Sequence, residues 1–121
     1  MANTIHRQVW VKVNAQVDAG VAPLIEALNR YPGIRTLESC EGNGDTAWIA
    51  FDCGGSGWKP LARVVLGELG PALMKDFGDR VSLSVTTTES GLYRAEMTVT
   101  RAVISAVVDS VKQLSTRTKA A

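Results

Sequence analysis

Alternation of apolar and polar residues predicts five β-strands along the chain. The clearest alternation covers residues 9–17, where valines at every second position are interleaved with Trp10 and Lys12. Residues 81–86 and 93–99 alternate in the same way, and two further stretches at 34–40 and 46–53 flank an Asn-Gly pair. A period of two places successive side chains on opposite faces, so each strand is expected to be half-buried.

Apolar residues at helical spacing predict three amphipathic helices. One begins near Val21 and ends before Pro32, a second covers residues 58–69, and the third follows Thr100 and buries residues between 104 and 114. The pair Gly70-Pro71 is expected to end the second helix, with Gly70 as a cap at positive φ, before a short helical piece at 71–78. Residues 115–121 have no apolar pattern and are expected to form a frayed tail.

The elements follow the order β-α-β-β-α-β-β-α. This order predicts an α+β fold, in which a mostly antiparallel five-stranded sheet has its helices packed on one face. The chain of 121 residues fits a single domain that spans its whole length.

The segment from 34 to 53 is predicted to be a hairpin, because Asn43-Gly44 is a strong signal for a two-residue turn. A regular register places Arg35 opposite Asp52 on the face away from the helices. It places Glu38 and Cys40 on the apolar face. A one-residue bulge would instead turn Glu38 outward and put Leu37 inside.

Composition narrows the function classes. Thirteen basic and twelve acidic residues give a net charge of +1, whereas a general nucleic-acid binder usually carries a strong basic excess.

The two cysteines, Cys40 and Cys53, are too few for a secreted disulfide framework. The hairpin register also separates them by more than a disulfide allows. The N-terminal residues lack the apolar core of a signal peptide, and no apolar run is long enough for a membrane span. The expected compartment is therefore the cytoplasm.

Glu38 and Cys40 form the first candidate for chemistry. A carboxylate on the apolar face would have a raised pKa unless it were paired, and a neighbouring thiol would need a cationic group or base to become a nucleophile. A buried cysteine more often simply packs. The four residues Ser39-Cys40-Glu41-Gly42 resemble the Ser-Cys-Ser-Gly motif of the tRNA wybutosine-synthesis methyltransferase family. The basic residue that follows the glycine in that family is Asn43 here, and the resemblance implies no activity for this chain.

A glycine-rich loop before the second helix is the second candidate. Exposed amides of Gly55, Ser56 and Gly57, with Lys59 nearby, are the groups that bind a phosphate or another anion at a helix N-terminus. The spacing matches neither common phosphate-binding motif, and a flexible connection capped by Ser56 explains the loop equally well. With His6 as the only histidine, the sequence predicts no metal site, no catalytic triad and no cofactor.

The tryptophans give the third candidate. Trp10 and Trp48 each alternate with residues of the apolar face, so both are expected on the open face of the sheet. Leu37 and Ala50 are expected to join them, with Lys12, Arg35 and Asp52 around the patch. An aromatic patch with a charged fringe is typical of a surface that contacts another molecule. A loop or the 71–78 segment covering this face within the monomer is the alternative.

Two functional hypotheses follow. The first is a non-enzymatic protein-binding module that contacts a protein partner, or itself, through the open sheet face. A small regulator or inhibitor, such as a phage-type anti-defence protein, would have this composition. The second is a small-molecule or nucleotide-binding domain, with enzymatic activity left open. It would use the loop with Gly42 and Gly44, the loop from Gly54 to Gly57, and the side chains of Glu38 and Cys40.

Overall fold

Four antiparallel strands form the main sheet in the computed structural model, which describes residues 8–10, 16–40, 44–54 and 58–120. The strands lie in the spatial order β3-β4-β6-β5, so β3 and β5 form the two edges. Their bounds are β3 (Arg35–Cys40), β4 (Thr46–Asp52), β5 (Val81–Thr87) and β6 (Tyr93–Thr100). The predicted α+β class with an antiparallel sheet is confirmed.

The prediction of a fifth strand in this sheet is wrong. Instead of one strand over residues 9–17, the chain forms two short strands, β1 (Gln8–Trp10) and β2 (Gln16–Asp18), which pair only with each other. Val9 lies opposite Val17 in this pair. An alternating pattern continues through both arms of a hairpin, so alternation alone does not distinguish a hairpin from one long strand.

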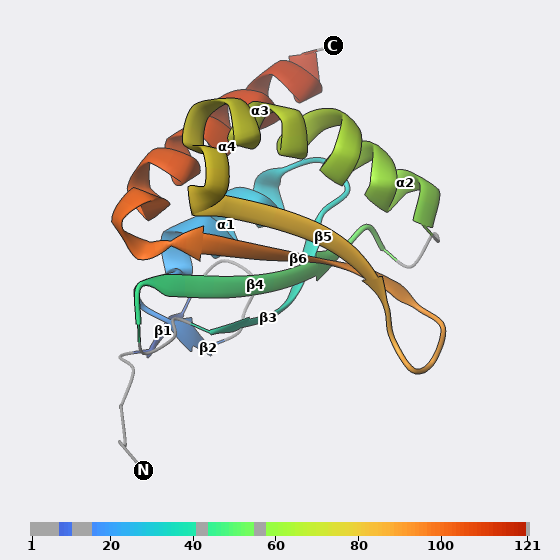
Figure 1. The fold of residues 1–121 in the computed structure, drawn as a ribbon, viewed down its shortest axis with the longest axis horizontal. Helices are drawn as coiled ribbons and strands as arrows, with labels where there is room; N and C mark the ends of the chain where they lie inside the picture. Colours follow the sequence, from blue (N-terminus) through green and yellow to red (C-terminus); the bar gives the residue numbers. More distant parts are fainter. Residues whose placement is uncertain (1–7, 11–15, 41–43, 55–57, 121) are drawn as a thin grey trace.

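The helices lie together on one face of the sheet (Figure 1). They are α1 (Ala22–Arg30), α2 (Trp58–Ala62), the π-helical segment η1 (Arg63–Leu69), α3 (Gly70–Phe77) and α4 (Ile104–Ala120). Two short 3₁₀ turns, η2 (Gly78–Arg80) and η3 (Arg101–Val103), lead into β5 and α4.

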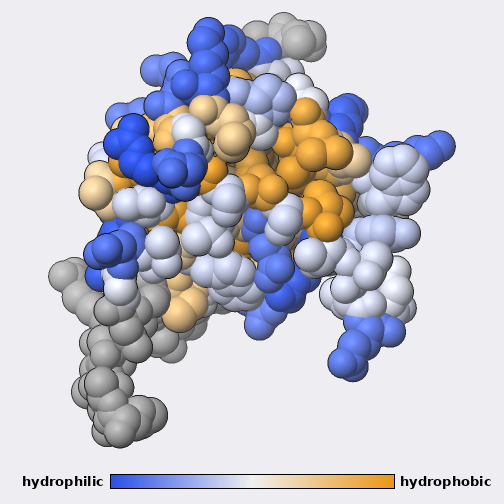
Figure 2. Space-filling model, viewed as in Figure 1, coloured by the Kyte–Doolittle hydropathy of each residue, from blue (hydrophilic) through white to orange (hydrophobic). Residues whose placement is uncertain are grey.

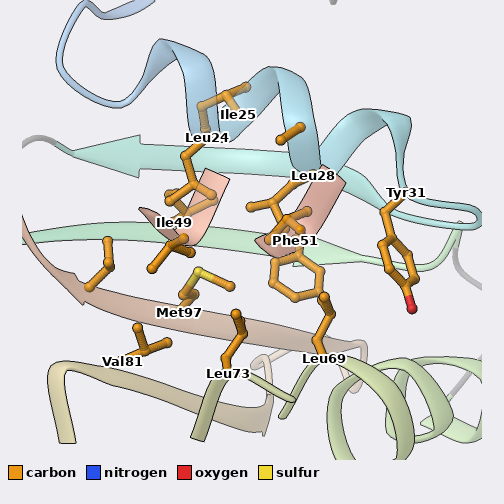
Figure 3. Packing of buried hydrophobic residues seen from close by; sticks show 14 of the residues in the cluster. Leu24, Ile25, Leu28, Tyr31, Ile49, Phe51, Leu69, Leu73, Val81 and Met97 are labelled. Carbon is orange, nitrogen blue, oxygen red and sulfur yellow. The ribbon is translucent and has the colours of Figure 1, made fainter. Parts of the chain in front are cut away.

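The core lies between this helical layer and the sheet. Figure 3 shows Leu24 and Leu28 of α1 pointing toward Ile49 and Phe51 of β4, with Leu73 of α3 on the other side. All five side chains are fully buried. Alternation along β4 and β6 then assigns every second residue to the opposite face, on which none of the described helices packs.

Gly70 does not cap a helix, which corrects the sequence prediction. Its φ is −56° and the helix continues through it into α3. The Gly70 N–H donates to the carbonyl of Val65, five residues earlier, and this π-type turn precedes Pro71. In an α-helix the proline ring would clash with the carbonyl four residues before it. The wider turn lets the helix continue past Pro71. The Gly-Pro pair alone did not predict this continuation.

The predicted frayed tail is wrong up to Ala120, where α4 ends. Ser115 is buried and its hydroxyl donates to the carbonyl of Arg30 at the end of α1, at 3.1 Å. Thr118 lies 3.3 Å from the hydroxyl of Tyr31. These polar contacts hold the last turns of α4 against α1. Because hydroxyl side chains make them, the sequence shows no apolar periodicity over these turns.

Candidate functional site

The face of the sheet opposite the helices is the first candidate site. Trp48 of β4 lies between Cys40 of β3 and Thr98 of β6 in one cross-strand row. In the next row Ala50 lies between Glu38 and Glu96. Apart from Trp48 and Ala50, the rows named here present polar side chains.

Arg94 ties these rows together. Its guanidinium donates to Glu38 at 2.6 Å and to Glu96 at 3.2 Å, and it lies over the Trp48 ring, 5.6 Å from the centroid. The Trp48 indole N–H also donates to Glu96, at 3.2 Å. The hydrogen bond to Glu38 is the main reason that the pKa of Arg94 is raised above its usual value. The four side chains therefore hold one another in a fixed arrangement on the open face.

Arg35 and Asp52 form a second ion pair on this face. They lie directly opposite each other, as the hairpin register predicted, and two hydrogen bonds of 2.9 and 3.2 Å join them. These bonds raise the pKa of the exposed Arg35 guanidinium. The Asp52 carboxylate also accepts from the Gly54 N–H at 3.0 Å, which fixes the direction in which the chain leaves β4.

The positions of Glu38 and Cys40 correct the sequence prediction. Between Thr36 and Glu38 the register shifts, so that Thr36 lies opposite Phe51 but Glu38 lies opposite Ala50. This bulge at Leu37 moves Glu38 and Cys40 from the apolar face to the open face. The Glu38 side chain is 60% exposed and paired with Arg94, so the carboxylate expected on the apolar face is not there. Leu37 is 42% exposed rather than inside.

The remaining residues expected on the open face have different outcomes. Trp10 belongs to β1, which is not part of the main sheet, and its side chain lies outside the described residues. Lys12 also lies outside them. The structure therefore brings Trp48 and Arg35 onto the face, with Leu37 beside it at the bulge. Arg94 and Glu96, which the sequence analysis did not select, hold the cluster together. Their alternation with Ala95 and Met97 was the feature of the sequence that could have placed them on this face.

The two glycine-rich loops are only partly described. Gly44 and Gly54 are placed, whereas Gly42, Asn43, Gly55, Ser56 and Gly57 lie outside the described residues. Lys59 is exposed near the start of α2. The expected anion site therefore remains a sequence prediction, whereas the regular register that a two-residue turn predicted is wrong beside it, because Cys40 lies opposite Trp48 rather than Ala47.

A partly buried polar cluster between Tyr31 and the η1 segment does not provide reactive groups. The Tyr31 hydroxyl donates to Glu68 of η1 at 2.5 Å, and Arg63 lies 3.7 Å from the same carboxylate. Burial, followed by this hydrogen bond, raises the pKa of Tyr31 to about 12. Burial likewise raises the pKa of the Cys53 thiol. Both shifts favour the protonated forms at neutral pH, whereas a nucleophilic thiol needs a lowered pKa.

Within the described ranges, no three His, Cys, Asp or Glu side chains gather into a group that could hold a metal ion. Over the same ranges, no helix has the length and apolar character needed to cross a bilayer. Cys40 and Cys53 are present as thiols, near opposite ends of the β3–β4 hairpin.

An apolar groove along β5 was not predicted. It has a volume of about 320 Å³ and lies between β5 and the η1–α3 helix, where Leu66 and Met74 are 69% and 56% exposed. Figure 2 shows apolar side chains gathered on this side of the molecule. A second hollow, lined in part by Trp58 and Tyr93, continues toward the other end of β5. Leu66 and Met74 interrupt the polar sides of their helices. This interruption was the feature of the sequence that could have predicted the groove.

No protein-family model, curated protein or solved structure matches this chain. Fold and surface together define an α+β sheet protein with one face covered by helices, one open polar face and one apolar edge.

Proposed function

We propose that this chain is a non-enzymatic protein-binding module whose partner docks on the open sheet face around Trp48 and Arg94. The supporting observation is the cluster itself, in which Arg94 is held between Glu38 and Glu96 over the Trp48 indole. Tryptophan and arginine are the residue types most enriched among those that dominate interface energies.

Mutual support within the cluster favours binding because its side chains are ordered before a partner arrives. A side chain that is already fixed loses less conformational entropy on association. Arg94 is 24% exposed, so its charge is held in place but remains close to the surface. The more exposed Glu38 carboxylate offers an acceptor to a basic or hydrogen-bond-donating group of the partner.

A pull-down from the native host followed by mass spectrometry tests the proposal. Tagged wild-type chain is compared with Trp48→Ser and with Trp58→Ser, which makes the same chemical change at an exposed tryptophan on α2. We expect a stoichiometric protein that is captured by wild type and Trp58→Ser and lost with Trp48→Ser.

A second variant guards against loss of folding. Glu38→Lys reverses an exposed charge in the cluster and is expected to leave the thermal melting curve nearly unchanged while it weakens capture of the same protein. Capture that survives both Trp48→Ser and Glu38→Lys, or that depends only on Trp58, would overturn the proposal. A co-purifying metabolite in place of a protein would favour a small-molecule binder instead.

A further inference from the structure

We infer that two copies of this chain associate through β5, which pairs with β5 of the second copy across a two-fold axis. The inference is independent of the proposed partner site, because it concerns the edge of the sheet rather than its open face. It would make one continuous eight-stranded sheet with the helices of both copies on the same side.

The first observation is the character of the β5 edge. The strand has seven residues, pairs with β6 without a register shift, and has β6 as its only neighbour in the described sheet. It contains no proline and no charged residue. Natural edge strands usually carry charges, prolines or bulges that prevent pairing with another chain. β5 has none of these features, which is expected of an edge that is paired.

The other edge is protected. β3 carries the charged residues Arg35 and Glu38, has a bulge at Leu37, and has β2 lying against it. Pairing of further copies through β3 is therefore disfavoured. An assembly that uses only β5 closes as a dimer and cannot extend into a filament.

The second observation is that β5 is self-complementary. When Ser84 lies on the two-fold axis, Leu83 of each copy faces Val85 of the other, and Ser82 faces Thr86. Val81, Leu83 and Val85 are on the helix side of the strand, with exposure lower than that of Ser82, Ser84 and Thr86. Antiparallel pairing in this register keeps apolar side chains on the helix side in both copies. Because β5 carries no charge, no like charges meet within the paired strands.

The third observation is the apolar groove beside the same edge. Leu66 and Met74 line it with Leu83, and both helix residues are largely exposed. A two-fold axis at Ser84 brings the η1–α3 helices of the two copies toward each other above the joined strands. These apolar side chains then leave water together with the strand edges, which stabilises the contact.

The size of the contact indicates a reversible dimer. A strip about 23 Å long and about 20 Å wide, the depth of one strand and one helix, buries on the order of 900 Å² in total. This area is below the roughly 1,000 Å² that a stable specific interface needs and is typical of weak, transient contacts. We therefore expect a dissociation constant in the micromolar range.

Sedimentation of the full chain over a concentration series tests the inference. Wild type is expected to shift from monomer to dimer as concentration rises. Ser84→Lys places two positive charges opposite each other on the axis and is expected to raise the dissociation constant by roughly a hundredfold or more. Thr46→Lys, at an exposed strand position on β4, is the matched control and should leave the dimer intact, as should Trp48→Ser.

Cysteine crosslinking tests the register. With oxidised glutathione as the oxidant, Ser84→Cys is expected to form a disulfide-linked dimer, because the two positions face each other. In this register Ser82→Cys places the two thiols about 13 Å apart along the strands, too far for a bridge. The unsubstituted chain, which keeps Cys40 and Cys53, gives the background level.

Several results would overturn the inference. They are a monomer at every concentration, a dimer that survives Ser84→Lys, crosslinking through Ser82→Cys that equals or exceeds that through Ser84→Cys, and a dimer that is lost with Trp48→Ser. The last result would place self-association on the open face. A dimer that behaves as expected while no partner is captured would leave this inference standing and remove the proposed function.

Discussion

The guanidinium of Arg94 lies over the indole of Trp48, 5.6 Å from the ring centroid. Both side chains also bond to Glu96, so the stacking is one contact within a larger cluster. A double-mutant cycle measures the total coupling of the two side chains, which includes any part transmitted through their shared acceptor Glu96. With Arg94→Gln and Trp48→Leu, we expect a coupling free energy of about 0.5–1 kcal/mol in urea unfolding, as for a partly exposed cation–π pair.

A coupling near zero would mean that the ring and the guanidinium are neighbours without mutual stabilisation. The matched cycle pairs Arg94→Gln with Asp52→Asn, since the Asp52 carboxylate is engaged with Arg35 rather than with the Arg94 cluster. That cycle should be additive. Additivity in both cycles would argue that the cluster is not ordered before binding, and would weaken the proposed interface.

Gly70→Ala is expected to destabilise the protein by about 1–3 kcal/mol. A Cβ at Gly70 would collide with the carbonyl oxygen of Val65, which is the acceptor of the Gly70 N–H. Gly67→Ala is the matched control in the same π-helical segment, because a Cβ there meets nothing within 4 Å. It should be neutral or stabilise by up to about 1 kcal/mol through helix propensity. Equal melting temperatures for the two variants would contradict the continuous helix.

Tyr31 should make stability depend on alkaline pH. Its pKa is raised from 10.0 to about 12 in the folded protein, so the folded state retains a proton that the unfolded state loses between these values. The stabilisation is therefore complete below about pH 10 and is lost as pH rises toward about 12. Urea unfolding across this range should show a steeper loss for wild type than for Tyr31→Phe. Parallel curves would show that the hydroxyl titrates normally.

The parts that the sequence predicted are those governed by local pattern. Alternation located β5 and β6, helical spacing located α1 and the buried face of α4, and the hairpin register placed Arg35 opposite Asp52. Each of these depends on periodicity or on a short turn, which neighbouring residues determine.

The parts that it missed depend on contacts between distant segments. A bulge that turns Glu38 outward was the alternative to a regular register, but nothing near Leu37 favours it, and the partner of Glu38, Arg94, lies on a strand distant in sequence. Gly70 is required for close approach to Val65 rather than for a positive φ. The candidate site therefore became visible only when β3, β4 and β6 were placed side by side.

The end of α4 provides the last prediction. Ser115→Ala removes a hydroxyl that donates to the carbonyl of Arg30 from a buried position. We expect a loss of about 1–2 kcal/mol, because the Arg30 carbonyl at the end of α1 loses this donor. Thr116→Ala is the matched control, since the exposed Thr116 hydroxyl bonds only within its own helix, to Lys112. It should change stability by less than about 0.5 kcal/mol.

Truncation after Leu114 extends the test, because it also removes the contact of Thr118 with Tyr31. It should lower the melting temperature more than Ser115→Ala does, whereas removal of Ala120 and Ala121 alone should have little effect. A truncated chain as stable as wild type would mean that residues after 114 form a frayed tail, and that the hydroxyl of Ser115 does not hold α4 to α1.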